Sequence, residues 1–174
     1  MSAFAQLEDA RPDLDLILTD VLSAVLSEEA MPTQNQLPTE PLAVARLAIH
    51  DQIADLYAIV EIRAGVSLAR VIAARMMSVA APLPEDIVDA VAEVGNIIGG
   101  NVKSLLCHHA RLSLPSSEIT AQDPYTELDF GVSGAYVRAI VLGHVAQLAV
   151  QPDAAIEGLM WPPYTPDEIP ERSS

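Results

Sequence analysis

The sequence predicts a single domain of the α/β (α+β) class, in which a sheet packs against long helices. Three observations predict it. The chain has 174 residues, of which 51% are hydrophobic, so it can bury one sizeable core and is not disordered throughout. Some segments repeat apolar residues at helical spacing, which predicts amphipathic helices. Other segments are rich in branched residues and partly alternate with polar ones, which predicts strands.

The first half of the chain predicts one helix and two strands. Residues 13–29 place their apolar side chains on one helical face. Residues 30–41 are polar and proline-rich, which is typical of a loop. Residues 42–50 and 56–64 are rich in branched residues, and we expect both to be strands.

Two helices are expected next. Residues 66–80 return to helical spacing, with Ser67 as a candidate N-cap. The following helix begins at Pro84, because proline suits a first helical turn, and it runs to about Cys107. Residues 110–120 then predict a strand that is stopped or bent at Pro115.

The last third of the chain is less regular. Residues 122–131 read as a loop, and residues 134–151 read as two strands broken near Gly143, with a helix as the alternative. We expect residues 1–12 to be a flexible N-terminus and residues 152–174 to form a proline-rich, acidic C-terminal tail. The domain itself would span residues 13–151.

Charge and composition exclude several classes of function. The net charge is −15, from 24 acidic and 9 basic side chains, and such a surface repels nucleic acids and anionic membranes. The longest uncharged stretch, residues 139–152, is too short to span a bilayer, and the N-terminus does not resemble a secretory signal. Cys107 is the only cysteine, which fits a reducing cytoplasm.

The helix predicted at 84–107 carries the candidate functional residues. At about 100° per residue, its polar and small residues fall on one narrow stripe, and its large apolar residues fall on the opposite face, which we expect to be buried. The stripe consists of Asp89, Glu93, Asn96, Gly100 and Lys103. The apolar face consists of Val91, Val94, Ile98, Val102 and Leu105.

Glu93 and Asn96 are therefore neighbours that could act on one target. A carboxamide offers an acceptor and two donors in one plane, so Asn96 could orient a water molecule. Glu93 could pair with a lysine of a partner. The spacing alone is weak evidence, and an ordinary solvated pair is the alternative. Two glycines in mid-helix are costly, so Gly99 and Gly100 serve either close packing inside the protein or the approach of a docking partner.

The segment 86–115 resembles the CheX branch of the CheC/CheX chemotaxis phosphatases. Proteins of this family carry a helix of the form E-hydrophobic-x-N-hydrophobic-hydrophobic-x-G-N, followed by a Ser/Leu-Pro strand. The matching residues are Glu93, Asn96, Ile97, Ile98, Gly100, Asn101 and Leu114-Pro115. The order of elements over residues 14–150 also looks like the family. Only one E-x-x-N helix is present, which favours CheX over CheC.

The resemblance implies an α/β fold and a cytoplasmic role in two-component signalling. It implies a hydrolase that removes phosphate from the aspartate of a CheY-type response-regulator receiver, with Asn96 positioning the attacking water and Glu93 contacting the receiver's lysine. Asp89, Gly100 and Lys103 would contact the partner. The receiver would supply Mg²⁺, so the chain would need no cofactor of its own. CheX-like proteins are usually homodimers joined through their sheets. The alternative is a non-catalytic CheX-like adaptor that binds a receiver.

The run Cys107-His108-His109 raises the question of a metal site. Consecutive residues at a helix end point in different directions, and a structural zinc site needs four converging ligands. We therefore expect no metal ligands here, and the helix dipole is the simpler explanation for these histidines. Asn101 lies off the stripe, which favours an internal hydrogen bond. Trp161 could anchor a partner, but folding back on the domain is the preferred interpretation.

Overall fold

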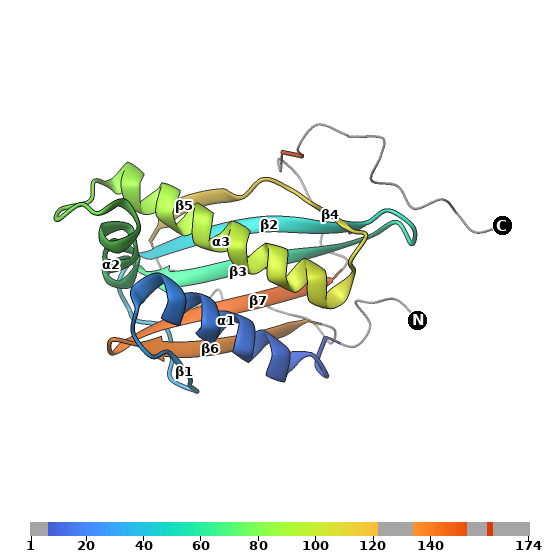
Figure 1. Ribbon diagram of the computed structural model, residues 1–174, viewed down its shortest axis with the longest axis horizontal. Helices are drawn as coiled ribbons and strands as arrows, with labels where there is room; N and C mark the ends of the chain where they lie inside the picture. The colour runs from blue at the N-terminus through green and yellow to red at the C-terminus, as the bar shows by residue number, and fades with distance from the viewer. Residues whose placement is uncertain (1–6, 122–133, 153–159, 162–174) are drawn as a thin grey trace.

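A computed structural model describes residues 7–121, 134–152 and 160–161, and in these residues the chain forms one antiparallel sheet with helices on one face (Figure 1). The strands are β1 (Met31–Pro32), β2 (Leu42–Asp51), β3 (Leu56–Gly65), β4 (Arg111–Leu112), β5 (Ser116–Thr120), β6 (Ala135–Val141) and β7 (His144–Pro152). Their order is β1-β6-β7-β3-β2-β4, and β5 pairs with β2 as well. The predicted fold class is confirmed.

Two hairpins build the centre of the sheet. β2 and β3 are paired over their full length, from Leu42 opposite Gly65 to Asp51 opposite Leu56. β6 and β7 meet at a turn whose residues Leu142 and Gly143 both have positive φ, 52° and 77°. Such tight turns match the twist of the strands they join, and glycine takes this conformation without steric cost.

The helices are α1 (Arg11–Leu26), α2 (Val66–Met77) and α3 (Pro84–Leu106). Figure 1 shows α1 and α3 side by side across one face of the sheet, with α2 at one end. α3 packs mainly on β2, and α1 packs on β6. The core lies between these helices and the sheet, where Leu18, Leu47 and Leu148 are fully buried.

Most of the expected elements are present. The strands predicted at 42–50 and 56–64, the three helices and the strand bent at Pro115 are confirmed, the last as β4 and β5. The alternative of a helix over 134–151 is wrong, because β6 alternates between buried and exposed residues before the turn at Leu142-Gly143. The loop expected at 122–131 and nearly all of the tail lie outside the described residues.

Three details differ from expectation. Residues 30–41 contain the short strand β1, which local sequence does not signal because it exists only by pairing with β6. Ser67 is not the N-cap of α2; Gly65 is, and both the backbone N–H and the hydroxyl of Ser67 donate to Glu40. α1 begins at Arg11, two residues earlier than expected, and Leu7 before it is buried in the core. The division into residues 1–12, 13–151 and 152–174 remains a prediction.

Candidate functional site

α3 is a long helix with conventional end signals. Pro84 occupies its first turn, and the Asp86 carboxylate accepts the backbone N–H of Leu83 at 2.8 Å. Acidic residues in the first turn lie at the positive end of the helix dipole, and Lys103 in the last turn lies at its negative end, so both interactions stabilise the helix. These end signals are local, so the sequence alone marks where the helix begins.

Two glycines lie on the face of α3 that packs on the sheet. Gly95 and Gly99, one turn apart, lie on β2: an added Cβ would stand 2.9 Å from the Cβ of Ala45 at Gly95 and 2.5 Å from Cδ1 of Leu47 at Gly99. Real Cβ atoms do not approach other atoms so closely, so the helix backbone can reach the sheet only because both residues lack a side chain. The stripe on the far side of α3 is consequently held away from the sheet.

The predicted stripe is on the surface. Asp89, Glu93 and Asn96 are exposed, and Gly100 and Lys103 are half-buried. Glu93 and Asn96 stand one helical turn apart, which places their Cβ atoms about 5–6 Å from each other. Within the part of the chain that the structure describes, neither side chain has a hydrogen bond or an ion pair. Both are therefore available to a partner.

The structure separates the two roles that were open for the glycines. Gly99 serves internal packing against Leu47, whereas a Cβ at Gly100 would meet nothing within 4 Å. Gly100 thus leaves an open position beside the acid and the amide, where another backbone could approach. Helical spacing placed Gly100 on the stripe, but the sequence could not show that Leu47 lies against Gly99, because that contact joins two distant segments of the chain.

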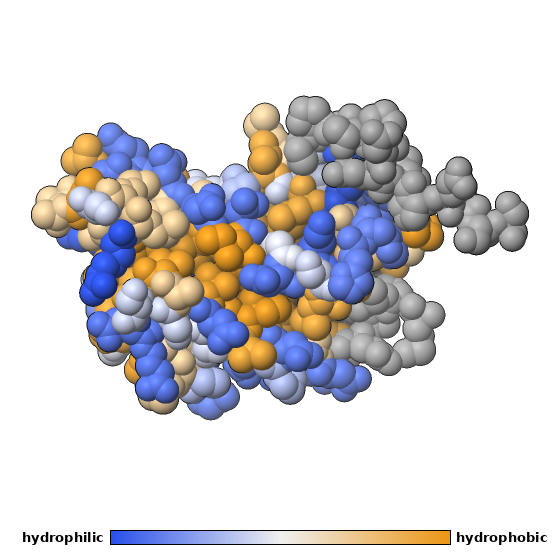
Figure 2. Space-filling view, in the orientation of Figure 1, coloured by the Kyte–Doolittle hydropathy of each residue, from blue (hydrophilic) through white to orange (hydrophobic). Residues whose placement is uncertain are grey.

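The outward face of α3 is not entirely polar. Leu105, expected on the buried face, is 38% exposed and lies in the last turn of α3. Ile97, next to Asn96, is also 38% exposed, and Leu16 of α1 is exposed as well. Figure 2 shows apolar surface over α1 and α3 on this face of the molecule. An acid and an amide beside apolar surface suit a docking face with a polar centre.

Two further expectations concern single residues. The Asn101 amide donates to the carbonyl of Ile97 at 3.1 Å, so the expected internal hydrogen bond is confirmed. Trp161 folds back on the domain, as preferred: its ring meets His50 and Tyr57 edge-on, at centroid distances of 6.0 and 6.3 Å.

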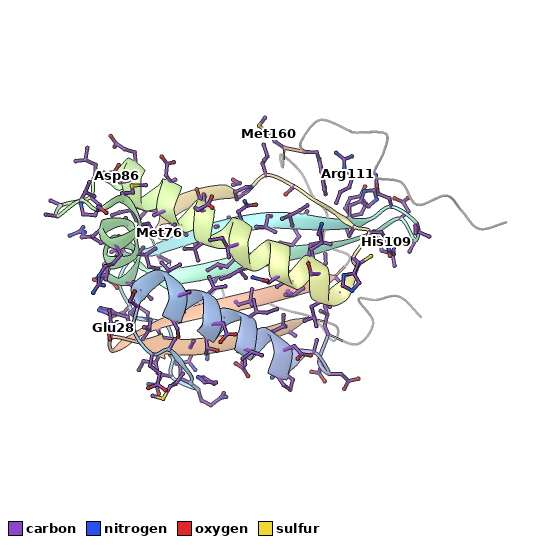
Figure 3. The ribbon with its side chains drawn as sticks, in the orientation of Figure 1. Glu28, Met76, Asp86, His109, Arg111 and Met160 are labelled. Atoms are coloured by element: carbon purple, nitrogen blue, oxygen red, sulfur yellow. The ribbon has the colours of Figure 1, made fainter. Side chains whose placement is uncertain are left out.

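A second group of polar side chains lies at the other end of α3, where Figure 3 labels His109. Nε2 of His109 is 3.3 Å from Sγ of Cys107 and 3.3 Å from Oδ1 of Asp51. These three donor atoms all lie within 4.8 Å of one another. The sequence did not indicate Asp51 as a member of this group, because Asp51 is far away in the chain.

Burial and charge perturb this group. Burial raises the pKa of the Cys107 thiol above its ordinary value, and the negative charge of Asp51 adds to the effect. Burial also acts to raise the pKa of Asp51, but hydrogen bonds from the backbone N–H groups of Ala54 and Ile53, and from Cys107 and His109, lower it overall. The group therefore holds a thiol beside an ionised carboxylate.

The fold and the exposed stripe define a class: a mixed α/β protein whose antiparallel sheet carries a long helix that presents an acid and an amide to solvent. The family model described as "Chemotaxis phosphatase CheX" matches residues 48–125, which include Glu93, Asn96 and Gly100. Over that stretch the chain is similar to the CheX family, as the motif in α3 indicated.

Solved structures share the fold. The chemotaxis protein CheX from Vibrio vulnificus is 16% identical, with a TM-score of 0.62 over 80% of this chain and 96% of that one. CheX from Desulfovibrio desulfuricans is 16% identical, with a TM-score of 0.62 over 84% and 99%. CheX from Borrelia burgdorferi, solved as a CheX-CheY-BeF3-Mg²⁺ complex, is 15% identical, with a TM-score of 0.53 over 79% and 96%. No curated protein matches significantly.

None of the helices in the described residues is long and apolar enough to cross a membrane. The structure places all five predicted stripe residues on one face of α3, but it does not test their roles. The catalytic roles of Glu93 and Asn96 and the partner contacts of Asp89, Gly100 and Lys103 therefore stay predictions.

Proposed function

We propose that this chain is a phosphatase, a hydrolase that dephosphorylates the phosphoaspartate of a CheY-type response-regulator receiver and so ends a chemotaxis or other two-component signal in the cytoplasm. One observation carries the proposal. Glu93 and Asn96 stand one turn apart on the exposed face of α3, have no partner among the described residues, and lie beside the open position at Gly100.

The proposed hydrolysis needs few catalytic groups from this chain. A water oxygen attacks the phosphorus, the bond between phosphorus and the aspartate oxygen breaks, and inorganic phosphate and a free carboxylate result. Such transfers depend on positioning and electrostatics. In the proposal, the Asn96 carboxamide accepts from the water and aims its lone pair in line with the leaving oxygen, without being consumed.

The remaining groups come from two molecules. Glu93 pairs with the receiver's active-site lysine and fixes the register of docking. Asp89 and Lys103 contact the receiver on either side, and Gly100 lets its backbone approach. The receiver supplies the phosphoaspartate and the Mg²⁺ that neutralises developing charge, so the phosphatase reaction draws on no metal of this chain. The Borrelia burgdorferi relative, solved together with CheY and Mg²⁺, supports a partner of this kind.

The test is the rate of dephosphorylation of a Mg²⁺-loaded, phosphorylated receiver, with wild-type protein, Asn96→Ala and Asn101→Ala. Asn101 is a matched control, since it is an exposed asparagine on the same helix whose amide is bonded to Ile97. We expect Asn96→Ala to lose about 100-fold or more in rate while binding persists. Asn101→Ala should keep the wild-type rate.

Other outcomes would change the assignment. Binding of the phosphorylated receiver without acceleration by wild-type protein would leave a non-catalytic adaptor. Equal losses in Asn96→Ala and Asn101→Ala would point to damage to the helix rather than to catalysis. The homodimer that the resemblance implies is also part of the proposal, and sedimentation equilibrium of the purified chain tests it directly.

A further inference from the structure

We propose that Asp51, Cys107 and His109 form a binding site for one zinc-type divalent ion, at the junction between the end of α3 and the β2–β3 hairpin. The inference is independent of the proposed phosphatase activity. It reverses the sequence-based expectation of no metal ligands, which rested on the assumption that Cys107 and its neighbours continue a helix.

The local structure shows why that assumption fails. Cys107 is the C-cap of α3, with extended backbone at φ −162° and ψ 100°, so residues 107–109 leave the helix. The chain then turns, and the N–H of Ala110 donates to the Cys107 carbonyl at 3.1 Å. This turn brings the side chain of His109 back beside that of Cys107. Side chains two residues apart would diverge on a continuing helix.

The third donor is fixed from the other side. Oδ1 of Asp51 accepts the backbone N–H groups of Ile53 and Ala54, at 2.9 and 3.1 Å, in the turn between β2 and β3. These bonds hold the carboxylate in one orientation and keep it ionised. Both N–H groups bind Oδ1, so the acceptor positions of Oδ2 are free of them and the carboxylate keeps room for a metal. Such outer hydrogen bonds are typical of metal-binding carboxylates.

Two of the three donor separations are close to those around a tetrahedral ion, and the third, between Cys107 and Asp51, lies within 4.8 Å. Zinc bonds of about 2.0–2.3 Å that meet at tetrahedral angles place neighbouring donor atoms about 3.3–3.6 Å apart. His109 Nε2 lies at 3.3 Å from both the sulfur of Cys107 and the oxygen of Asp51. Sulfur, imidazole nitrogen and carboxylate oxygen are the donor set that zinc takes in proteins.

A hydrogen-bond network explains the same group less well. One ring nitrogen, Nε2, faces both Cys107 and Asp51 and can donate its single hydrogen to only one of them, so the other contacts of a network depend on the thiol, which is a weak donor. Its distance to the Asp51 oxygen, 3.3 Å, is also longer than a usual N–H···O bond. A charged relay of the Cys-His-Asp type would use both ring nitrogens of the histidine, one for each partner. Three donors that converge on one point suit a cation better.

The site has a route to solvent. The side chains of Asp51 and Cys107 are buried, whereas that of His109 is 39% exposed. Three protein ligands with water in the fourth position form a familiar zinc arrangement. Cys107 follows Asn96 by eleven residues on α3, which is about 16 Å along a helix. The ion would therefore join α3 to the hairpin rather than take part in phosphoryl transfer.

The test uses Co²⁺ as a spectroscopic probe of the chelator-treated, full-length protein. Because Cys107 is the only cysteine, a thiolate-to-cobalt charge-transfer band reports this site alone. We expect one Co²⁺ per chain, with that band and with the intense visible bands of tetrahedral cobalt, and displacement by Zn²⁺. His109→Asn should weaken binding at least tenfold, and His108→Asn, a matched exposed neighbour, should not.

Thermal unfolding gives a second measurement that does not depend on the thiolate. Zinc should raise the Tm of wild-type protein and of His108→Asn by several degrees, because an ion that binds only the folded state stabilises it. The Tm of His109→Asn should not change, because that variant lacks one of the ligands. The exposed ring of His109 makes that variant safe for folding, whereas Cys107→Ser tests the ligand directly but alters the core. Absence of the charge-transfer band, or a band that survives in His109→Asn, would overturn the site.

Discussion

Gly99 lies directly against Leu47 of β2: a Cβ added at this glycine would stand 2.5 Å from Cδ1, 2.9 Å from Cδ2 and 3.2 Å from Cγ of the leucine. The whole end of a fully buried side chain would have to move to admit one methyl group. Gly100, the next residue, has nothing within 4 Å of the same position. Gly99 therefore serves packing inside the fold, whereas Gly100 leaves an open position on the outer side of α3.

This contrast predicts opposite effects of one substitution. Gly99→Ala should lower the free energy of unfolding by about 1–3 kcal/mol, through overpacking against Leu47. Gly100→Ala should raise it by about 0.5–1 kcal/mol, because alanine is the better helix former and meets no obstacle. Urea denaturation of both variants measures the difference. If Gly100→Ala also slows receiver dephosphorylation while stabilising the fold, the open position serves docking; equal destabilisation of both variants would contradict the packing described here.

A second prediction concerns the charge cluster of Glu61, Arg46 and Arg63, on the sheet face away from the helices. Glu61 is 5% exposed and accepts hydrogen bonds from Nε of both Arg46 and Arg63. Glu61→Ala would leave two guanidinium groups without their shared carboxylate. Because Arg46 is partly exposed and water would screen it, we expect a loss of about 1–3 kcal/mol rather than the full cost of a buried pair.

Glu118 provides the control for that measurement. It pairs with the same Arg46 at 3.1 Å, but its side chain is exposed. Glu118→Ala should therefore change the free energy of unfolding by less than about 1 kcal/mol. Both variants are compared by urea denaturation at low and high salt. A larger loss for Glu118→Ala than for Glu61→Ala would show that burial does not determine how much each carboxylate contributes to the free energy of unfolding.

The third prediction follows from the raised pKa of Cys107. Only the thiolate reacts with iodoacetamide, so in metal-free protein the alkylation rate should still rise about tenfold per pH unit between pH 7 and 9. Asp51→Asn removes the charge that opposes ionisation, while its amide oxygen can still accept the N–H groups of Ile53 and Ala54. That variant should react faster at each pH. A rate that levels off by pH 8 in wild-type protein would mean that the thiol is not held protonated.

The fourth prediction rests on the proposed function. Lys103 is the only lysine of the chain and lies on the stripe with Glu93 and Asn96. Lys103→Ala should weaken binding of the phosphorylated receiver about two- to fivefold, as expected for one partly exposed charge pair, and the difference should shrink at high salt. Arg70→Ala, which removes an exposed positive charge from α2, is the matched control. An equal effect of Arg70→Ala would indicate net charge rather than a contact.

The sequence alone predicts α3 and its stripe because both depend on spacing along the chain. Pro84 and the acidic first turn mark where the helix starts, and residues three or four apart share a face whatever the rest of the fold does. The strands β2 and β3 were predicted for the same reason, since strand alternation has a period of two. The resemblance to CheX rested on that same local stretch.

Other features required the tertiary structure. β1 exists only because Met31 and Pro32 lie beside β6, and the different roles of Gly99 and Gly100 depend on where Leu47 stands. The group of Asp51, Cys107 and His109 joins residues that are 58 positions apart. Periodicity is a property of neighbouring residues, so the sequence by itself determined which face of α3 is polar. Contacts between distant segments depend on where each helix ends and how each strand pairs. Only the tertiary structure therefore decided that Asp51 lies beside Cys107 and His109 at the end of α3.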